Sequence, residues 1–388
     1  MVQDKLSLKM YSKKPSFWER EVFLKDIDLL IVGSGLVGLL SALELRSKFP
    51  RKKIVIFERG AIPSGASTKN AGFTCFGSLS ELIADLETEP FDSVVELACR
   101  RYKGLQKLLS IVDREQIHYR ECGGLEIFKE GQESLYEVCS RQLDKFNLAF
   151  QNKLGLPRVY RKANELIKSN GLVEVSNLII NQYEGQLNTG LLLYTLLEKA
   201  KDAGIIIYNG FEVSRIDDTK EGSCAILRNG WKIMAGKIIV ANNAFAQHLF
   251  PEIKVKAVRN PVLITKPIKD LKLNGTFHMN EGYIYFRNVN DRVLIGGARH
   301  LSKIEETTSE FGINPLIEKH LISLLDNMVL RDTAYEIDTK WSGILGVGEN
   351  KNPIIKAMSK NTIIAVKMGG MGVAISSLVA SEVCEMIN

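Results

Sequence analysis

The feature that most constrains the fold lies near the start of the chain, in residues 29–58. Residues 28–32 form a short apolar run, which is typical of a buried parallel strand. The glycine-rich segment 33–38 follows at once, and residues 39–46 then carry apolar side chains at helical spacing. A second apolar run ends on Glu58. This order predicts a strand, a tight turn, a helix and a second strand.

Each glycine of this unit suits the binding of a dinucleotide. Gly33 permits the tight turn, Gly35 lets a pyrophosphate approach the backbone, and Gly38 lets the helix pack close to the sheet. Backbone N–H groups at the helix start, together with the helix dipole, would hold the phosphates. Glu58 ends the second strand, where a carboxylate can accept hydrogen bonds from ribose hydroxyls. We predict a dinucleotide site; the alternative is a glycine turn that only packs a helix on a sheet. The residues assigned to it are Gly33, Ser34, Gly35, Leu36, Val37, Gly38, Glu58 and Arg59.

Residues 63–73 indicate which dinucleotide to expect. They read Pro-Ser-Gly-Ala-Ser-Thr-Lys-Asn-Ala-Gly-Phe, and such small and polar residues let several backbone donors approach a flat polar ring. The segment closely resembles the Gly-Ala-Ser-x-(Arg/Lys)-Asn-x-Gly stretch of the D-amino-acid oxidase superfamily, which includes glycine oxidase, sarcosine oxidase and the γ-glutamylputrescine oxidoreductases. The resemblance implies that this stretch runs beside the isoalloxazine ring of FAD. The implied contacts are Ser67, Thr68, Lys69, Asn70, Ala71 and Gly72.

Further matches to the superfamily follow in order along nearly the whole chain. Residues 204–214 resemble the segment in which the superfamily's chain returns to the FAD domain, and there the backbone of a valine contacts the adenine. Residues 237–243 resemble the strand that ends near the cofactor. Residues 367–374 resemble the C-terminal glycine loop, whose helix N-terminus faces the pyrimidine end of the flavin. The cofactor contacts implied by these matches are Val213, Ala241, Asn242, Gly369, Gly370, Met371, Gly372 and Val373.

The intervening segments predict a second, substrate-binding domain. Residues 81–167 carry amphipathic helical patterns around one strand, whereas residues 251–338 alternate in the manner of long antiparallel strands, with a hairpin tip at Asp291-Arg292. A chain of 388 residues is also too long for one ordinary core. We predict an α/β (α+β) fold with a discontinuous, Rossmann-like FAD-binding domain and a substrate domain built on a mostly antiparallel sheet. The predicted FAD-binding segments are 1–80, 168–250 and 339–388, and the substrate-binding segments are 81–167 and 251–338.

Side chains of the substrate domain are candidates for substrate binding. Tyr283 and Tyr285 alternate along one strand and so share a face, which Arg287 continues. The superfamily places a tyrosine of this strand over the flavin, and Tyr283 matches it best; sheet packing is the alternative for both tyrosines, and a solvated strand end for Arg287. Arg299 and His300 follow the next glycine turn and would line the cleft or serve the structure. The predicted substrate contacts are Tyr283, Tyr285, Arg287, Arg299, His300, Trp341 and Leu345.

The chain departs from the superfamily at the segment that binds the substrate carboxylate. Amino-acid oxidases carry Gly-(Ile/Leu)-Arg-Pro there, and the arginine grips the carboxylate in a bidentate fork. Leu345 and Gly346 stand at the matching positions, and burial of an unpaired carboxylate beside a leucine would cost several kcal/mol. Residues 15–18 and the Trp-Ser-Gly that begins at Trp341 resemble the γ-glutamylputrescine branch, whose substrates are amines. The resemblance therefore implies oxidation of an amine or amino-acid-like substrate by hydride transfer to flavin N5, with no acid–base residue strictly needed.

A second departure concerns the electron acceptor. Sarcosine oxidase activates oxygen with a lysine, and Leu294 stands at the corresponding position. Lys69 could replace the charge of that lysine, or it could face a phosphate group or solvent. Both oxygen and an electron-transfer protein or compound therefore stay open as the electron acceptor. No cysteine lies near Leu345, where sarcosine oxidase attaches its flavin, so we expect non-covalent FAD. Cys75 is expected to be a packed thiol.

Composition narrows the kinds of partner, metal and cellular location that we expect. A net charge of +6 without a long basic block fits an anionic cofactor or substrate and disfavours nucleic acid as a partner. None of the six cysteines lies in a CxxC pair or at zinc-like spacing, so no metal is expected. No apolar stretch reaches the roughly 20 residues that span a bilayer, and we expect a cytoplasmic protein that at most touches a membrane surface. Two alternatives are kept: a 2-hydroxy-acid or glycerol-3-phosphate type dehydrogenase on the same fold, and a flavin-binding subunit or RNA-modification partner without catalysis.

Overall fold

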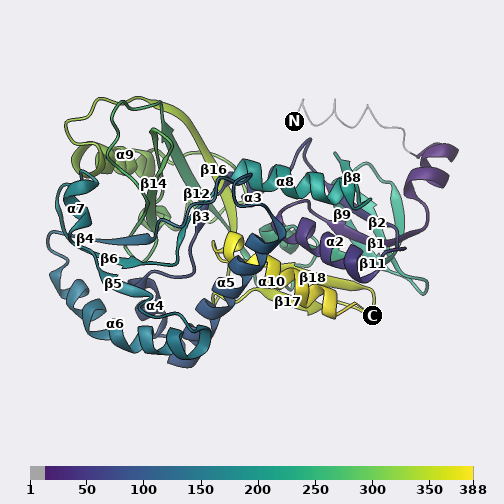
Figure 1. Cartoon of the computed structure of the whole chain (residues 1–388). Coiled ribbons are helices and arrows are strands. Elements are labelled where there is room, and N and C mark those ends of the chain that lie inside the picture. Colours follow the sequence, from purple (N-terminus) through teal and green to yellow (C-terminus); the bar gives the residue numbers. More distant parts are fainter. Residues whose placement is uncertain (1–13, 388) are drawn as a thin grey trace.

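The structure is a computed structural model, and it describes residues 14–387. Two large sheets occupy the two halves of the molecule (Figure 1). This mixed α/β architecture confirms the predicted fold class. The carboxyl ends of the parallel strands in the first sheet, where the predicted cofactor residues lie, point toward the second sheet. The arrangement of the two sheets therefore decides which side chains meet between them.

The first sheet contains the predicted dinucleotide unit. Its strands run in the order β17-β18-β11-β1-β2-β8, and all neighbours except β17 and β18 are parallel. The antiparallel strands β9 and β10 extend from β11. The bounds are β1 (Ile27–Val32), β2 (Ile54–Glu58), β8 (Ile206–Asn209), β9 (Val213–Asp218), β10 (Ser223–Leu227), β11 (Lys232–Val240), β17 (Ile354–Ala357) and β18 (Thr362–Val366).

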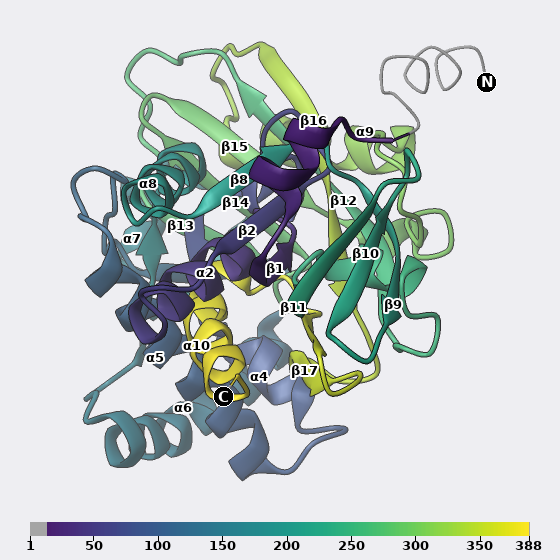
Figure 2. The same ribbon diagram turned by 90° about the vertical axis from the view of Figure 1, so that its right-hand side faces the viewer.

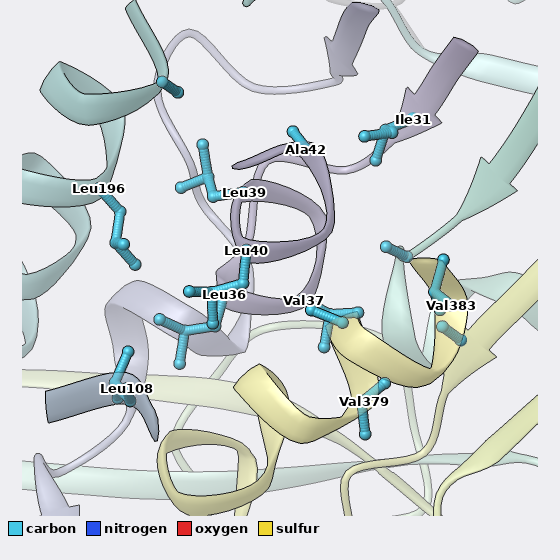
Figure 3. Packing of buried hydrophobic residues seen from close by; sticks show 14 of the residues in the cluster. Ile31, Leu36, Val37, Leu39, Leu40, Ala42, Leu108, Leu196, Val379 and Val383 are labelled. Carbon is cyan, nitrogen blue, oxygen red and sulfur yellow. The ribbon is translucent and has the colours of Figure 1, made fainter. Parts of the chain in front are cut away.

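Four helices cover one face of the first sheet. They are α2 (Leu36–Lys48), α5 (Phe91–Ile111), α8 (Thr189–Asp202) and α10 (Gly372–Glu385). Figure 3 shows Ile31 of β1, Leu108 of α5, Leu196 of α8 and Val379 of α10 gathered around Leu40 of α2, and all five side chains are fully buried. Full burial of one such side chain contributes about 1.5–3 kcal/mol. This packing holds the first turn of α2, where the glycine-rich segment ends, at the carboxyl edge of the sheet.

The opposite face of the first sheet is covered by strands rather than helices. Leu30, Val55 and Ile238 pack there against Ala225 and Ile233 of the β10–β11 hairpin. Figure 2 shows α2 and α10 on one side of β1, and β9 and β10 on the other. The alternation of Leu29 and Leu30 between two apolar layers explains why the strand reads as a continuous apolar run.

The second sheet is mostly antiparallel, as predicted. Its order is β16-β12-β15-β14-β13-β4-β6-β5, and only β13 and β4 are parallel. The bounds are β4 (Gly124–Lys129), β5 (Tyr160–Lys162), β6 (Val175–Asn181), β12 (Lys256–Thr265), β13 (Thr276–Met279), β14 (Ile284–Val289), β15 (Arg292–Gly297) and β16 (Ile337–Val347). Other elements include the short pair β3 (Phe73–Thr74) and β7 (Gly185–Gln186), and the helices α3 (Ala66–Lys69), α4 (Leu79–Asp85), α6 (Glu133–Leu154), α7 (Leu166–Ser169) and α9 (Pro315–Leu324).

The predicted hairpin tip at Asp291-Arg292 is wrong by one residue. Arg292 pairs with Val289 and begins β15, so the two turn residues are Asn290 and Asp291. Asn290 has φ +53°, a left-handed conformation that asparagine tolerates better than most residues. The physical signal for the turn was therefore the asparagine and not the charged pair after it.

The predicted domain boundaries divide elements that pack together. Helix α5 falls in the predicted substrate domain, yet it packs on α2 and α10 of the first sheet. Strands β6 and β16 fall wholly or mostly in the predicted FAD-binding segments, yet they pair within the second sheet. We propose that α5 belongs to the FAD-binding domain and that β6 and β16 belong to the substrate domain.

The aromatic segment at residues 15–18 leads into a short π-helix, η1 (Glu19–Leu24). Phe17 and Trp18 meet edge to face with ring centroids 5.1 Å apart. Both side chains are exposed, at 58% and 70%. Within residues 14–387, no helix combines the length and the apolar character needed to cross a membrane.

Candidate active site

A cavity of about 770 Å³ lies between the two sheets. Its wall combines the carboxyl ends of β1, β2 and β11, the start of α10, and residues of β14 and β16. This volume is within the range of small-molecule and cofactor sites. The predicted cofactor residues on the wall are Gly33, Gly35, Leu36, Val37, Glu58, Arg59, Ser67, Lys69, Asn70, Ala71, Val213, Ala241, Asn242, Gly369, Gly370, Met371, Gly372 and Val373. The predicted substrate residues on the wall are Tyr283, Tyr285, Arg299 and Leu345.

The glycine turn after β1 is enforced by close backbone contacts. Gly33 has φ +106°, and a Cβ added there would lie 2.9 Å from the Ala241 carbonyl oxygen. A Cβ on Gly38 would lie 1.9 Å from the Gly33 carbonyl oxygen. Gly38 is not on the cavity wall, so its role is to seat α2 against the turn.

Glu58 is oriented by hydrogen bonds that leave part of its carboxylate free. Its Oε2 accepts from the backbone N–H (3.2 Å) and hydroxyl (2.7 Å) of Ser34, and its Oε1 accepts from the Gly60 N–H (2.9 Å). A carboxylate has about four acceptor positions, so the oxygens can still accept from ribose hydroxyls. Ser34 is fully buried and absent from the wall, which makes it a positioning residue for Glu58.

The loop before β3 joins the two predicted parts of the cofactor site. The Leu36 N–H donates to Ser67 Oγ at 2.9 Å, so α3 rests on the first turn of α2. Thr68 Oγ1 donates to the Pro63 carbonyl at 2.9 Å, and Asn70 Oδ1 accepts from the Gly72 N–H at 2.8 Å. Thr68 and Gly72 are not on the wall, so these two predicted contacts shape the loop instead.

Unpartnered polar atoms at the end of β11 fit a cofactor rich in hydroxyl and ring N–H donors. Asn242 Oδ1 and Asn243 Oδ1 are buried, lack a hydrogen-bond partner within residues 14–387, and belong to residues of the cavity wall. A Cβ added to Gly65 or Gly370 would meet nothing within 4 Å, so the wall is open at both glycines. Buried acceptors of this kind are costly unless a ligand or water satisfies them. The residues present therefore fit FAD, and Asn243 is a wall residue that the sequence reading missed.

Among the predicted substrate contacts on the wall, Tyr285 and Arg299 carry the best-defined polar groups. Asn260 Nδ2 donates to the Tyr285 hydroxyl oxygen at 2.9 Å, and burial raises the pKa of Tyr285. The Arg299 guanidinium lies 4.8 Å from the centroid of the Tyr283 ring. Arg299 forms no ion pair with any residue from 14 to 387, so its charge faces the cavity without a carboxylate partner from those residues. Tyr283 precedes β14 and lies in a turn.

Three predicted substrate contacts do not lie on this wall. Arg287 is 6% exposed, and its guanidinium donates to the Ala71 carbonyl (2.5 Å), to Gln186 (2.9 Å) and to the Leu187 carbonyl (3.1 Å). Its donors join residues 186–187 to the loop of residues 63–73, which we call the flavin-side loop because the sequence predicts that it runs beside the flavin. Burial lowers the pKa of Arg287 to about 10. Trp341 Nε1 donates to the Lys69 carbonyl at 3.0 Å. His300 lines a smaller, neighbouring cavity.

The sequence reading also missed polar residues on the wall. Glu81 of α4 accepts from Lys351 Nζ at 2.8 Å and lies 3.6 Å from Arg101. Burial opposes ionisation of Glu81, but these two cations hold its pKa below the usual value. His278 of β13 pairs in register with Tyr285 and lies on the same wall. These residues are far apart in the chain, so only the pairing of strands could have brought them together.

The sequence model of the FAD-dependent oxidoreductase family known as DAO matches residues 28–386, nearly the whole chain. The chain belongs to the DAO family. Like other members, this DAO-family protein is an FAD-dependent enzyme, in agreement with the cofactor cavity. The hypothesis of a non-catalytic flavin-binding subunit is accordingly set aside.

Named relatives of this DAO-family protein cover nearly its whole length. The glycine oxidase of Geobacillus kaustophilus is 23% identical over 93% of this chain and 92% of its own. Its crystal structure superposes with a TM-score of 0.73 at 21% identity, covering 92% and 94% of the two chains. The structure of L-proline dehydrogenase from P. horikoshii superposes with a TM-score of 0.73 at 18% identity, covering 94% of each chain. The L-α-glycerophosphate oxidase of Mycoplasma pneumoniae, solved with FAD bound, superposes with a TM-score of 0.70 at 18% identity, covering 93% of this chain and 94% of its own. These structures share the fold.

Proposed function

We propose that this protein oxidises a carbon–nitrogen bond of an amine or amino-acid-like substrate. FAD, when bound, supplies the chemistry by accepting a hydride from the carbon next to nitrogen. The proposal rests on one wall of the cavity, where Tyr285 and Arg299 lie with residues 69–71 of the flavin-side loop. A small substrate held there would lie beside the cofactor. The names of two relatives refer to glycine and L-proline, which supports a nitrogen-bearing substrate.

The charges on this wall define which substrates can bind. Leu345 lines the cavity at the position where amino-acid oxidases carry their carboxylate-binding arginine, so this position offers no charge to a carboxylate. Arg299 lines the cavity as well and can take a carboxylate through a charge-assisted hydrogen bond. We infer that an amine without a carboxylate packs against Leu345, and that an amino acid turns its carboxylate toward Arg299.

A second candidate function has specific support. Arg299 and Lys69 would also suit a 2-hydroxy acid or a glycerol phosphate, and the L-α-glycerophosphate oxidase shares the fold. Lys69 Nζ lies 5.2 Å from the centroid of the Phe311 ring, and no described carboxylate pairs with it. Such a substrate would place an alcohol carbon, not an amine carbon, beside the cofactor.

Anaerobic reduction of the bound flavin separates the two candidates. The purified holoenzyme is mixed with glycine, sarcosine, L-proline or putrescine, and separately with lactate or glycerol 3-phosphate. We expect one or more of the nitrogen compounds to bleach the visible flavin absorption, and the hydroxy compounds to leave it unchanged. Bleaching by the hydroxy compounds alone would establish the second candidate, and no bleaching by any of the six would contradict both.

A further inference from the structure

Behind the cavity wall, a buried carboxyl group and a buried imidazole face each other. Glu184 Oε2 and His278 Nε2 lie 3.7 Å apart, and the side chains are 1% and 9% exposed. Neither atom has a hydrogen-bond partner within residues 14–387. We call these residues the Glu184–His278 pair. Two enclosed polar atoms that point at each other without a formed hydrogen bond are costly unless they exchange a proton or meet a ligand group.

The carboxyl group of Glu184 is fixed by one of its two oxygens. Oε1 accepts from the N–H groups of Phe76 (2.9 Å) and Gly77 (3.1 Å) and from Asn181 Nδ2 (3.1 Å). Oε2 lies against the backbone of β4, because a Cβ added to Gly124 would be only 2.0 Å from it. The three hydrogen bonds therefore direct Oε2 toward the imidazole, and no hydrogen-bond donor within residues 14–387 reaches it.

His278 connects this carboxyl group to the cavity. It lies in β13, opposite Tyr285 of β14, and its ring centroid is 5.0 Å from that of Phe73. His278, Tyr285 and Phe73 all belong to the cavity wall, whereas Glu184 does not. Nε2 is enclosed and faces Glu184, so Nδ1, which makes no hydrogen bond within residues 14–387, is the ring nitrogen left for a group in the cavity.

Burial keeps the pair close to neutral. Burial raises the pKa of Glu184 to about 7, and the nearby carboxyl groups of Glu81 and Glu126 add to this shift. Burial lowers the pKa of His278 to about 4, although the carboxyl group of Glu81 acts in the opposite direction by favouring the charged imidazolium. The titratable and charged groups around the pair are Cys75, Glu81, Arg101, Glu126, Tyr160, Tyr285 and Lys351. An uncharged imidazole beside a carboxyl group that titrates near neutrality is suited to passing on one proton.

We propose that the Glu184–His278 pair takes up the proton that an amine substrate must lose before its carbon–nitrogen bond is oxidised. His278 would be the catalytic residue that touches the substrate, and Glu184 the positioning residue that receives the proton behind it. This inference rests on the proposed function, since the proton concerned is the one that a protonated substrate nitrogen carries.

The transfer balances without any further reactant. Nδ1 of His278 takes a proton from the substrate ammonium while the proton on Nε2 passes to Oε2 of Glu184. An ammonium ion and a carboxylate ion become a neutral amine and a neutral carboxylic acid, and no electrons are exchanged. A buried site disfavours both ions, so neutralisation is favoured there. The 3.7 Å separation exceeds a hydrogen bond, and it closes when the ring turns on substrate binding, as catalytic contacts commonly tighten in the complex.

The first test needs no substrate. Holoenzyme labelled in the histidine ring nitrogens is followed by NMR from about pH 5 to about pH 9, with the His278 signals assigned from the H278Q variant. The chain has only five histidines, so the spectrum is simple. We expect the His278 signals to pass through one inflection near pH 7, where Glu184 titrates. The inflection should vanish in E184Q and persist in E126Q.

Glu126 is the matched control for Glu184. It is 3% exposed, pairs in register with His278 from β4, and is absent from the cavity wall. Its two oxygens accept hydrogen bonds from the N–H of Ser80, and Oε1 also accepts from the Ser80 hydroxyl. His278 signals that do not change with pH in the wild type, or that keep their inflection in E184Q, would overturn the proposal.

The second test follows flavin reduction by whichever of glycine, sarcosine, L-proline and putrescine reacts fastest. In E184Q we expect the rate at neutral pH to fall by about 10²-fold and to recover at high pH, where the substrate loses its proton unaided. E126Q should keep the wild-type profile. A loss in E184Q that is equal at every pH indicates a structural role only and contradicts the proposal.

The two tests distinguish failure of this proposal from failure of the proposed function. If none of the four compounds reduces the flavin, the proposed function fails, and the NMR inflection alone decides whether Glu184 and His278 share a proton. If a compound reduces the flavin with the same pH profile in wild type and E184Q, the proposed function stands and the proton transfer is rejected.

Discussion

Glu184 links the stability of this protein to pH at the scale of a single residue. Burial raises its pKa from 4.5 to about 7 in the folded state. The stabilisation due to its bound proton is complete below the unfolded pKa and is lost as pH rises through the folded pKa. E184Q keeps the shape of the protonated acid, so we expect it to unfold like the wild type at about pH 4.5 and to be more stable by on the order of 3 kcal/mol at about pH 8. Urea unfolding at the two pH values checks this; a difference that does not depend on pH would contradict it.

Arg299 is the residue expected to separate amino acids from amines. If its guanidinium holds the substrate carboxylate, R299L loses a charge-assisted hydrogen bond, and KM for the carboxylated substrate should rise by about 10- to 100-fold. KM for the corresponding amine should stay unchanged. R292L is the matched control, because Arg292 pairs with Asp338 at 2.7 Å away from the cavity wall. Equal effects of R299L on both substrates in steady-state kinetics would remove Arg299 from substrate recognition.

At the scale of elements, the sequence allowed prediction wherever a local pattern decided the structure. The β1–α2–β2 unit and the antiparallel character of β12, β14 and β15 follow from periodicity and from glycine positions. Alternation puts Arg287 on the same face of β14 as Tyr285, and both side chains lie against residues 71–73. It could not reveal that carbonyl oxygens of Ala71 and Leu187 occupy its donors, because these partners come from distant segments.

The polar residues around His278 illustrate what no local pattern could predict. Glu81, Glu184 and Lys351 belong to a helix and two loops whose sequences show no shared spacing. Glu184 meets His278 because β6, β4 and β13 lie side by side in the second sheet, whereas Glu81 and Lys351 lie outside these strands and pair with each other. A buried carboxyl group is stable only when tertiary contacts satisfy it, so its position depends on the complete fold.

The crossing of α5 and α10 is the element contact on which the cofactor wall most depends. A Cβ added to Gly104 would lie 2.3 Å from the Ala374 carbonyl oxygen, at the first turn of α10. G104A should separate the helices, destabilise the protein by about 1–3 kcal/mol, and weaken FAD binding through Gly372 and Val373.

G190A in α8 is the control for G104A, because its Cβ would meet only the Asn188 side chain, at 3.4 Å. We expect it to keep the wild-type stability or to gain up to about 1 kcal/mol. Thermal unfolding and FAD titration of both variants check these expectations. An unchanged FAD affinity in G104A would show that the start of α10 does not depend on this crossing.

At the scale of the whole molecule, the cavity joins segments from both sheets. Gly33, Asn70, Val213, Leu345 and Gly370 lie far apart in the chain and line one wall. FAD bound there should stabilise the folded chain as a unit, by about 2.7 kcal/mol at 100 times its dissociation constant. Denaturant unfolding of the protein with and without FAD measures this difference. An unfolding midpoint that does not depend on FAD concentration would show that the folded chain does not bind FAD.

The most direct test of the central claim is the isotope dependence of anaerobic flavin reduction. The holoenzyme is mixed in a stopped-flow instrument with a reactive amine or amino acid, prepared with hydrogen or with deuterium on the carbon next to nitrogen. If this protein removes a hydride from that carbon, the visible flavin absorption will disappear in one phase that deuterium slows several-fold. Reduction by hydroxy acids but by no nitrogen compound, or a rate that deuterium leaves unchanged at saturating substrate, would contradict oxidation of the carbon–nitrogen bond.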